Sequence, residues 1–414
     1  MQTQLAPQYR GTPEGEEAEA ILRKCVHCGF CTATCPTYQL LGDELDGPRG
    51  RIYLIKQVLE GQAPTRATQL HLDRCLTCRN CESTCPSGVQ YGHLVDIGRR
   101  IVDEQVPRPA GERARRWALK EGLPSPLFGP AMKLGQAVRG LLPTAVRAKV
   151  PAPRPTGARP RRSHARKVLS LEGCVQPSMA PNINAATARV LDAAGVETLT
   201  APRAGCCGAV KFHLNDHEGG RDEMRVNIDA WWPQVEAGAV EAIVVNASGC
   251  GAMVKDYGHV LRHDPAYAEK AARIAALARD PSELLPELLL AIAGRLQGKQ
   301  LAVPSGVFAY HPPCTLQHGQ QIRGGVETHL RALGFDIRAA ASESHLCCGS
   351  AGTYSVLQPG LSYRLRDRKL AYLAEIAPVA ILSANIGCIT HLQSGTGVPV
   401  RHWIEVLDEA LPKA

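Results

Sequence analysis

One cysteine spacing occurs twice in the first hundred residues and constrains the fold more than any other feature. The first copy reads Cys25-x2-Cys28-x2-Cys31-x3-Cys35-Pro36, and the second reads Cys75-x2-Cys78-x2-Cys81-x3-Cys85-Pro86. Thiolates are soft ligands for iron, and three closely spaced cysteines wrap around one [4Fe–4S] cluster while the fourth, next to proline, reaches the other cluster. We therefore expect one cluster on Cys25, Cys28, Cys31 and Cys85, and a second on Cys75, Cys78, Cys81 and Cys35.

The segment between the two cysteine groups predicts a helix. In "GRIYLIKQVLE", residues 50–60, the apolar side chains of Ile52, Ile55 and Leu59 recur at helical spacing. Four-cysteine spacings also hold zinc, but zinc motifs rarely show this doubled arrangement with its prolines. The sequence therefore predicts a helical domain over residues 1–105 that holds two [4Fe–4S] clusters.

The composition points to a cytoplasmic globular protein. The chain has 414 residues, of which 44% are apolar and 21% charged, as in ordinary globular proteins. We find no uninterrupted apolar run of about 18 residues, so we expect no membrane-spanning helix. The first twenty residues are acidic and lack the apolar segment of a signal peptide. In a reducing compartment, sixteen cysteines indicate metal or redox chemistry rather than disulfides.

Residues 106–166 are rich in Pro, Arg and Ala and predict a connecting segment. Between residues 122 and 171 there are ten Lys or Arg and no Asp or Glu. This charge suits either a solvated linker or attraction to an anionic membrane surface or an acidic partner. Nucleic acid is the weakest alternative, because no reading helix or aromatic platform accompanies the charge.

The same segment carries an apolar stripe at helical spacing, with basic residues on its other faces. A helix lying at a membrane surface and a helix packed on the protein's own core are both compatible with this pattern. The stripe consists of Leu127, Ala131, Leu134, Val138 and Leu141.

Residues 167–414 contain an internal repeat. Each half begins with a strand-like run that leads to a cysteine, "VLSLEGC" to Cys174 and "VFAYHPPC" to Cys314. A helical segment, a second strand-like run and a Cys-Cys-Gly triplet follow, and an apolar run then leads to the last cysteine of each half. Corresponding cysteines are separated by 140, 141 and 138 residues, so the two halves are homologous.

The repeat predicts two α/β lobes over residues 167–300 and 301–414, related by a pseudo-twofold axis. Alternation of strands and helices favours a parallel sheet in each lobe. The cysteines then lie just beyond the strand ends, where α/β folds place their sites. The expected fold class is therefore α+β and multidomain, with a helical two-cluster domain followed by two cysteine-rich lobes.

The paired cysteines are candidate metal ligands rather than a disulfide, because a bridge between neighbours would be strained. The following glycine permits a tight turn and a close approach of the backbone to a cluster. Lobe 1 offers Cys174, Cys206, Cys207 and Cys250 as a possible centre. Lobe 2 is expected to bind better, because His311 and His391 supply spare ligands, although His391 also suits a plain hydrogen-bonding role. An iron–sulfur centre, a zinc site and free thiols all remain open; the lobe 2 candidates are Cys314, Cys347, Cys348, Cys388 and His391.

The motifs together resemble the glycolate oxidase iron–sulfur subunit family. They are "CVHCGFCTATCP", "CLTCRNCESTCPSG" and the two "CCG" lobes, and "SHLCCGSAGTY", "ANIGCITHLQSG" and "VRHWIEVL" favour this branch. More broadly, the chain is similar to iron–sulfur subunits of lactate utilisation and anaerobic glycerol-3-phosphate dehydrogenase systems. Its lobes also resemble the catalytic subunit of heterodisulfide reductase.

The resemblance implies a helical ferredoxin-type domain and an electron-transfer role. In that family, an FAD-carrying subunit oxidises glycolate to glyoxylate, and a second subunit of flavin-binding type accompanies it. The iron–sulfur subunit passes electrons toward the membrane quinone pool, which implies a peripheral position at the inner face of the cell membrane. We find no Gly-rich dinucleotide fingerprint and no constellation suited to hydride abstraction, so we expect no catalytic residue for substrate oxidation in this chain.

Both lobes depart from the heterodisulfide reductase pattern, which ends each lobe in Cys-x-x-Cys. Here the first lobe ends Cys250-Gly251-Ala252-Met253 and the second Cys388-Ile389-Thr390-His391. Each lobe thus keeps four of the five cysteines that hold a noncubane cluster in that family, which weakens the case for disulfide cleavage. A catalytic subunit that reduces a disulfide or quinone, and a redox or iron sensor, remain as alternatives. The sequence does not decide between glycolate, lactate and glycerol-3-phosphate.

Overall fold

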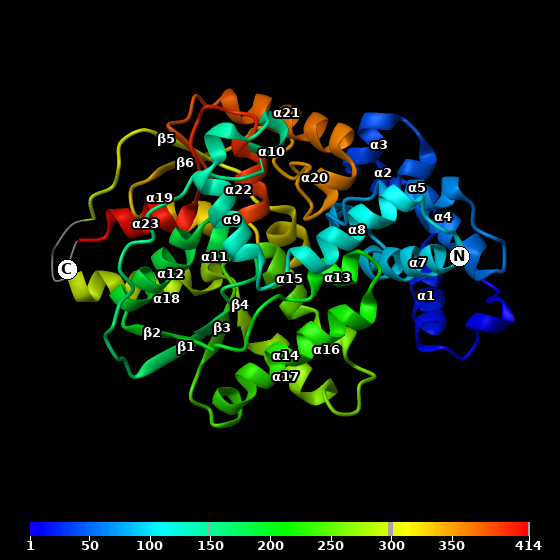
Figure 1. Cartoon of the computed structure of the whole chain (residues 1–414), viewed down its shortest axis with the longest axis horizontal. Helices are drawn as coiled ribbons and strands as arrows, with labels where there is room; N and C mark the ends of the chain where they lie inside the picture. The colour runs from blue at the N-terminus through cyan, green and yellow to red at the C-terminus, as the bar shows by residue number, and fades with distance from the viewer. Residues whose placement is uncertain (148, 297–300, 413–414) are drawn as a thin grey trace.

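The computed structural model describes residues 1–147, 149–296 and 301–412 of the chain. Figure 1 shows the N-terminal helices gathered at one end of the molecule and the two sheet-containing lobes at the other. None of the described helices is long and apolar enough to cross a bilayer. The fold class expected from the sequence is confirmed: a helical domain precedes two lobes that each contain a four-stranded parallel sheet.

The N-terminal domain is entirely helical in its regular structure. Thr12 caps α1 through its side chain, and prolines occupy the first turns of α1, α3 and α4, where no backbone donor is lost. Apolar faces of α1, α4 and α7 meet in one buried core. The elements are η1 (Pro7–Tyr9), α1 (Pro13–Lys24), α2 (Phe30–Ala33), α3 (Pro36–Leu41), η2 (Glu44–Asp46), α4 (Pro48–Leu59), α5 (Arg66–Asp73), α6 (Asn80–Thr84) and α7 (Tyr91–Gln105).

Residues 151–164 of the basic segment have no regular secondary structure, whereas residues 110–147 form helices. These are α8 (Ala110–Gly122), α9 (Phe128–Ala137), η3 (Arg139–Leu141) and α10 (Thr144–Arg147). α9 packs on α11 of lobe 1, where Gln136 donates a hydrogen bond of 3.2 Å to the carbonyl of Ser178. All five residues of the apolar stripe are exposed.

The two lobes have the same strand order, β2-β1-β3-β4 and β6-β5-β7-β8. The lobe 1 elements are β1 (Arg166–Ser170), α11 (Gln176–Met179), α12 (Pro181–Ala193), β2 (Val196–Thr200), α13 (Ala209–His213), α14 (His217–Glu236), β3 (Ala242–Val244), α15 (Ser248–Lys255), α16 (Tyr257–Val260), α17 (Ala268–Leu277), β4 (Ala278–Arg279) and α18 (Pro281–Leu296). Those of lobe 2 are β5 (Val307–Tyr310), the π-helical turn η4 (Thr315–Gly319), α19 (Gly325–Ala332), β6 (Asp336–Ala339), α20 (Tyr354–Leu357), α21 (Pro359–Ala374), β7 (Ala380–Ser383), α22 (Ile386–Gln393), β8 (Val400–His402) and α23 (Trp403–Ala410).

The lobes pack together through a shared apolar core. One buried cluster combines residues of β1, α12 and α18 with residues of β5, β7, α22 and α23. At the join, Ser248 donates a backbone hydrogen bond of 3.0 Å to Ala384, and the His402 ring lies 2.9 Å from the carbonyl of Asn246. This packing brings the cysteine-bearing edges of both sheets into the interior of the molecule.

Candidate functional site

The first cysteine pocket lies in the N-terminal domain and opens to the surface. It is a hollow of about 440 Å³ between the loop before α2, the start of α4 and the loop after α6. Cys28 is exposed on its rim, whereas Cys25 is buried at the end of α1. The cysteines that line it are Cys25, Cys28, Cys31, Cys81 and Cys85, which include all four expected for one cluster.

The second pocket adjoins the first, and its cysteines Cys35, Cys75 and Cys81 are buried. It measures about 300 Å³, and Pro48, Cys81 and Tyr91 line both pockets. Its cysteines are Cys35, Cys75, Cys78 and Cys81, the four expected for the other cluster. The crossed arrangement, in which the cysteine before each proline faces the opposite group, is therefore present in the pocket linings.

Left-handed backbone residues bend each cysteine loop around its pocket. His27 and Thr77 have φ of +56° and +51°, and Gly29 and Arg79 have φ of +85° and +57° at the next equivalent positions. Non-glycine residues adopt this conformation only where the surroundings hold it. In the second loop, the amide of Thr77 donates to Cys75 Sγ at 3.4 Å.

The buried thiols of the second pocket must lose their protons before they can act as metal ligands. Burial, followed by repulsion from Cys78 and Cys75, holds the pKa of Cys81 well above its ordinary value. Burial, followed by repulsion from Cys314 of lobe 2, likewise holds the pKa of Cys78 well above its ordinary value. Iron takes the place of the thiol protons when it binds, so these pockets fit [4Fe–4S] clusters in donor number and donor chemistry.

Two buried arginines beside the second pocket were not predicted from the sequence. Arg51, which is 1% exposed, donates to the His71 carbonyl at 2.7 Å and to Thr37 Oγ1 at 3.1 Å. Arg99 donates to the carbonyl of Leu72 at 3.0 Å and also to that of Cys75. Both lie on amphipathic helices, and nothing in their local pattern marks them as buried.

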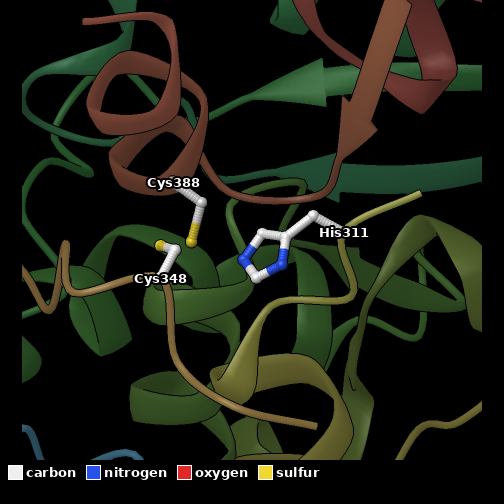
Figure 2. Close-up of side chains that lie close together, drawn as sticks. All are labelled: His311, Cys348 and Cys388. Carbon is white, nitrogen blue, oxygen red and sulfur yellow. The ribbon is translucent and has the colours of Figure 1, made fainter. Parts of the chain in front are cut away.

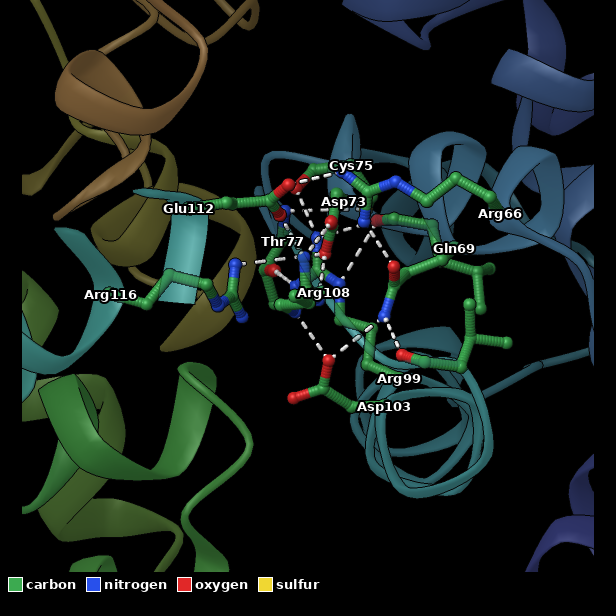
Figure 3. Close-up of polar contacts among 12 residues, drawn as sticks. Arg66, Gln69, Asp73, Cys75, Thr77, Arg99, Asp103, Arg108, Glu112 and Arg116 are labelled. Atoms are coloured by element: carbon green, nitrogen blue, oxygen red, sulfur yellow. Dashed lines mark hydrogen bonds and ion pairs between the residues drawn. The ribbon is translucent and has the colours of Figure 1, made fainter. Parts of the chain in front are cut away.

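A network of polar contacts next to this pocket fixes α8 to the N-terminal domain (Figure 3). Arg108 Nη1 lies 2.6 Å from Asp73 Oδ2 on α5, and the same guanidinium contacts Asp103 of α7 and Glu112 of α8. Gln69 donates to Asp103 at 3.0 Å. The expected boundary at residue 105 therefore falls within a region of dense contacts.

Lobe 2 holds its four cysteines in a buried row. Cys314 Sγ lies 3.7 Å from Cys347 Sγ. Cys348 and Cys388 continue the row, and their sulfurs form a three-donor group with the ring of His311 in which all ligand atoms lie within 4.8 Å of one another (Figure 2). The hydrogen bond with Cys347 lowers the pKa of Cys348, but contact with Cys388 and burial outweigh it and hold the pKa well above its ordinary value.

The Cys-Cys-Gly triplet requires glycine at its third position because the backbone of a neighbouring helix lies close to it. Gly349 has φ of +88°, and a Cβ atom there would collide with the carbonyl oxygen of Ser362 on α21. Gly208 in lobe 1 has φ of +87°, and its Cβ would lie 2.6 Å from the oxygen of Gly220. Each glycine lets the cysteine pair turn tightly against a long helix.

His391 lies outside the three-donor group. Its Nε2 is 3.1 Å from Ser362 Oγ, and its ring stacks on Tyr363 with centroids 5.9 Å apart. The structure thus gives His391 a hydrogen-bonding position, one of the two roles that the sequence left open. His311, three residues before Cys314, is the imidazole beside the thiols.

Lobe 1 arranges its cysteines similarly but with less burial. Cys206 and Cys207 are buried, whereas Cys174 and Cys250 are half-buried. Asn227 and the hydroxyl of Tyr257 donate to the carbonyls of Cys206 and Cys207 at 2.6 and 3.0 Å. Among the residues that the structure describes, these thiols form no three-donor group with a histidine.

The second pocket and the lobe 2 row are neighbours. Cys78 packs against a buried cluster that contains Cys314 and Cys347. Ser83 Oγ lies 3.0 Å from His318 Nδ1, and the hydroxyl of Tyr354 donates to the carbonyl of Arg74 at 3.0 Å. Two cysteine-rich sites that are far apart in sequence thus share one wall.

Buried Lys369 of α21 lies beside the row and is a further residue that the sequence did not reveal. Burial lowers its pKa to about 8, although nearby Cys348 and Cys347 act in the opposite direction. Its ammonium donates to the carbonyl of Glu343. A buried cation at this position would balance negative charge on the thiolates if they held a metal.

Comparisons with known proteins give one consistent result. A 4Fe-4S dicluster domain family matches residues 21–89, and a cysteine-rich domain family matches residues 168–255 and 308–393. The glycolate oxidase iron-sulfur subunit of Escherichia coli K12 is 55% identical over 415 residues, which cover 100% of both chains. The probable glycolate oxidase iron-sulfur subunit of Bacillus subtilis 168 is 31% identical over 91% of this chain and 89% of its own.

More distant similarity extends to another group of proteins. Lactate utilization protein A of Geobacillus thermodenitrificans NG80-2 is 26% identical over 58% of this chain and 98% of its own. The full-length matches decide the assignment: the chain belongs to the glycolate oxidase iron–sulfur subunit family.

Proposed function

From this membership we propose that the chain is the electron-transfer subunit of a membrane-associated glycolate oxidase complex. A partner subunit that carries FAD oxidises glycolate to glyoxylate, with a second subunit of flavin-binding type beside it, and this chain delivers the electrons toward a quinone. The observation that carries the proposal is the pair of adjoining pockets, each lined by its four expected thiols in the crossed arrangement. Two neighbouring clusters suit one-electron transfer between a donor and an acceptor.

We assign the ligands by pocket. Cys25, Cys28, Cys31 and Cys85 hold the first [4Fe–4S] cluster, and Cys75, Cys78, Cys81 and Cys35 hold the second. When bound, the clusters supply reversible uptake of one electron each. The protein supplies the thiolates, the amide of Thr77 toward a sulfur, and the buried charge of Arg51, all of which tune a cluster's potential.

The rim of the first pocket suits docking of the electron donor. Val26 and Phe30 are 68% and 62% exposed beside the exposed Cys28. Exposed apolar side chains next to a surface-lying redox site are typical of a protein contact. We therefore place the flavin partner at this rim, with the buried second pocket and lobe 2 behind it.

Reduction of the clusters by substrate tests the proposal. The complex is purified anaerobically, and bleaching of the iron–sulfur absorption is followed after addition of glycolate, D-lactate or glycerol-3-phosphate. We expect glycolate to reduce the clusters fastest, and no reduction when the flavin subunit is omitted. Reduction by lactate or glycerol-3-phosphate but not by glycolate would transfer the proposal to one of those substrates.

The docking rim has a separate test. Phe30→Glu places a charge at the rim without changing a cysteine, and we expect it to slow reduction of the clusters by glycolate at least tenfold while dithionite reduces them normally. Leu290→Glu, at an exposed apolar position on α18, is the matched control. Equal rates in the two variants would contradict docking at this pocket.

The exposed stripe of α9 supports contact with the membrane surface. Leu127, Leu134 and Leu141 are 74%, 67% and 88% exposed, and the surrounding segment carries ten basic and no acidic residues between positions 122 and 171. An apolar stripe flanked by positive charge suits the surface of an anionic bilayer. We propose that α9 and η3 hold the complex at the inner face of the membrane, near the quinone.

Flotation with vesicles tests this contact. We expect the purified complex to float with vesicles of anionic phospholipid at low salt and to be released at high salt. Leu134→Ser/Leu141→Ser should weaken binding, whereas Leu290→Ser should leave it unchanged. Flotation that is independent of these leucines would contradict the assignment of this stripe.

A further inference from the structure

The ring of His311 is buried without a hydrogen-bond partner. The side chain is 1% exposed, and neither Nδ1 nor Nε2 has a partner among the described residues. A neutral imidazole carries one donor and one acceptor, and leaving such groups unpaired in the interior costs about 1–3 kcal/mol each. An apolar side chain would fill the position at lower cost, so the ring itself points to a ligand.

The equivalent position of lobe 1 holds an apolar side chain instead of a histidine. The backbone amide of His311 donates to Leu382 of β7 at 2.8 Å, and the amide of Leu171 donates to Val244 of β3 at 3.0 Å. These are the same positions of the repeat, one residue beyond β5 and β1. Leu171 is buried at 2% exposure, so the scaffold accepts leucine at this place.

The ring of His311 faces two sulfurs. Figure 2 shows it directed toward Cys388 and Cys348, and its ligand nitrogen lies within 4.8 Å of both Sγ atoms. Thiolate and imidazole together are ligands for iron and zinc. The three donors come from three different segments, the β5 loop, the Cys-Cys-Gly turn and α22, so the tertiary fold assembles them.

We propose that His311 is a nitrogen ligand of an iron–sulfur centre in lobe 2, together with the thiols of Cys348 and Cys388. Cys347 and Cys314 continue the row of thiols beyond these two. The inference goes beyond the proposed function, which requires only the two ferredoxin-type clusters. The second pocket, whose Cys78 packs against Cys314 and Cys347, lies at the other end of the same row.

Mixed ligation has a consequence for electron transfer. Histidine ligands raise the potential of an iron–sulfur centre relative to cysteine ligands alone, as they do in Rieske centres. The buried ammonium of Lys369 adds positive charge beside the same thiols. With both groups bound, these residues would favour transfer of one electron from the second ferredoxin-type cluster to the lobe 2 centre, with no bond made or broken.

The test detects the nitrogen directly. The full chain is labelled with ¹⁵N-histidine, reconstituted anaerobically with Fe²⁺ and sulfide, and examined in graded states of reduction by pulsed electron paramagnetic resonance. We expect a strongly coupled histidine nitrogen in the wild type, its loss in His311→Gln, and its retention in His391→Gln. His311→Leu, which copies the residue of lobe 1, is a second variant that the fold accepts if glutamine does not.

A further variant keeps the site occupied. His311→Cys should restore a ligand without nitrogen, so that iron content is retained, the nitrogen coupling is absent and the potential of the lobe centre falls. A coupling that persists in His311→Gln, or that disappears in His391→Gln, would overturn the inference. A wild type with signals from the two ferredoxin-type clusters and no coupled nitrogen would overturn it while leaving the proposed electron-transfer function intact.

Discussion

Buried guanidinium groups give the second cysteine pocket a different electrostatic environment from the first. Arg51 lines only the second pocket and is 1% exposed, whereas Arg49, at the first pocket, is partly open to solvent. A positive charge stabilises a cluster more after it accepts an electron, and the effect is larger where water is excluded. The cluster of the second pocket is therefore expected to be the better electron acceptor of the two.

We predict that Arg51→Met lowers the midpoint potential of the second cluster. Removal of a charge worth about 1.4 kcal/mol corresponds to about 59 mV for one electron. Arg51→Lys is the matched control, because it keeps the charge and loses the planar group. A redox titration followed by electron paramagnetic resonance measures both, and equal potentials in Arg51→Met and the wild type would contradict the assigned role.

The glycine of the lobe 2 triplet gives a prediction about stability. Gly349→Ala must bring a Cβ atom into collision with a backbone oxygen at a φ of +88°, so we expect a loss of about 2–5 kcal/mol in the free energy of unfolding. Gly352→Ala is the control, because Gly352 has φ of +60° and nothing within 4 Å of its Cβ position. Chemical denaturation of both variants separates the steric contact from the backbone conformation.

At this scale the sequence indicated candidate ligands but said little about the side chains around them. Soft thiols at fixed spacing are recognisable in any context, so both pocket linings contain the cysteines expected of them. Arg51 and Lys369 lie in helices whose pattern resembles any solvated surface, and only tertiary packing buries them. The sequence placed His391 rather than His311 in the candidate ligand set of lobe 2, because the direction of a ring depends on the strand or helix that carries it and is not contained in the pattern.

Helix α8 shows how an element of the basic segment is tied to its neighbour. Arg108, buried at the start of this segment, joins Asp73 of α5 to Asp103 of α7 and Glu112 of α8 (Figure 3). Ion pairs of this kind stabilise little by themselves, but removing one partner leaves uncompensated buried charge.

We predict that Arg108→Ala lowers the free energy of unfolding by about 3–5 kcal/mol, because Asp73 then remains buried and loses its close partner, while Arg116 stays at 3.8 Å. Arg113→Ala, at an exposed position of the same helix, should change it by less than about 0.5 kcal/mol. Hydrogen exchange in α8 should increase in the first variant only. Similar stability in the two variants would contradict the buried role.

The strands and helices lie where the sequence pattern predicted them, but the pattern did not predict which of their faces are exposed. The repeated runs became β1, β5 and their partners in the same order in both lobes. The middle of the stripe lies in α9 and Leu141 lies in η3, but periodicity alone does not say which neighbour a face meets. Packing on α11 uses Gln136 and leaves the leucines outside.

Over the whole molecule, a polar cluster that we call the clasp joins the N-terminal domain to lobe 1. The rings of His93 on α7 and His259 on α16 stack with centroids 3.8 Å apart. His93 Nε2 lies 3.0 Å from Asp256 Oδ2, and His259 Nε2 lies 2.9 Å from Glu17 Oε1 on α1. Arg262 adds a contact of 2.6 Å to Glu17, so both carboxylates hold cations across the interface.

Two groups of the clasp have pKa values that are shifted in opposite directions. Burial alone would lower the pKa of His93, but the hydrogen bond and charge of Asp256 outweigh burial and raise the pKa above 6.5, although Arg79 opposes them. Burial would raise the pKa of Glu17, but His259 and Arg262 lower it to about 2. The stabilisation that His93 contributes is present below pH 6.5 and is lost as pH rises through its raised pKa. The stabilisation that Glu17 contributes is present above pH 4.5 and is lost as pH falls toward 2.

We therefore predict that His93→Gln destabilises the protein most between about pH 5 and 6.5, and that the difference from the wild type shrinks as pH rises toward about 9. At low pH the protonated ring pairs with Asp256, and at high pH glutamine and neutral histidine offer similar hydrogen bonds. His263→Gln, at an exposed position after α16, is the control and should show no such trend. Denaturation at a series of pH values gives the two curves, and a difference that grows with pH would mean that the clasp does not depend on a protonated His93.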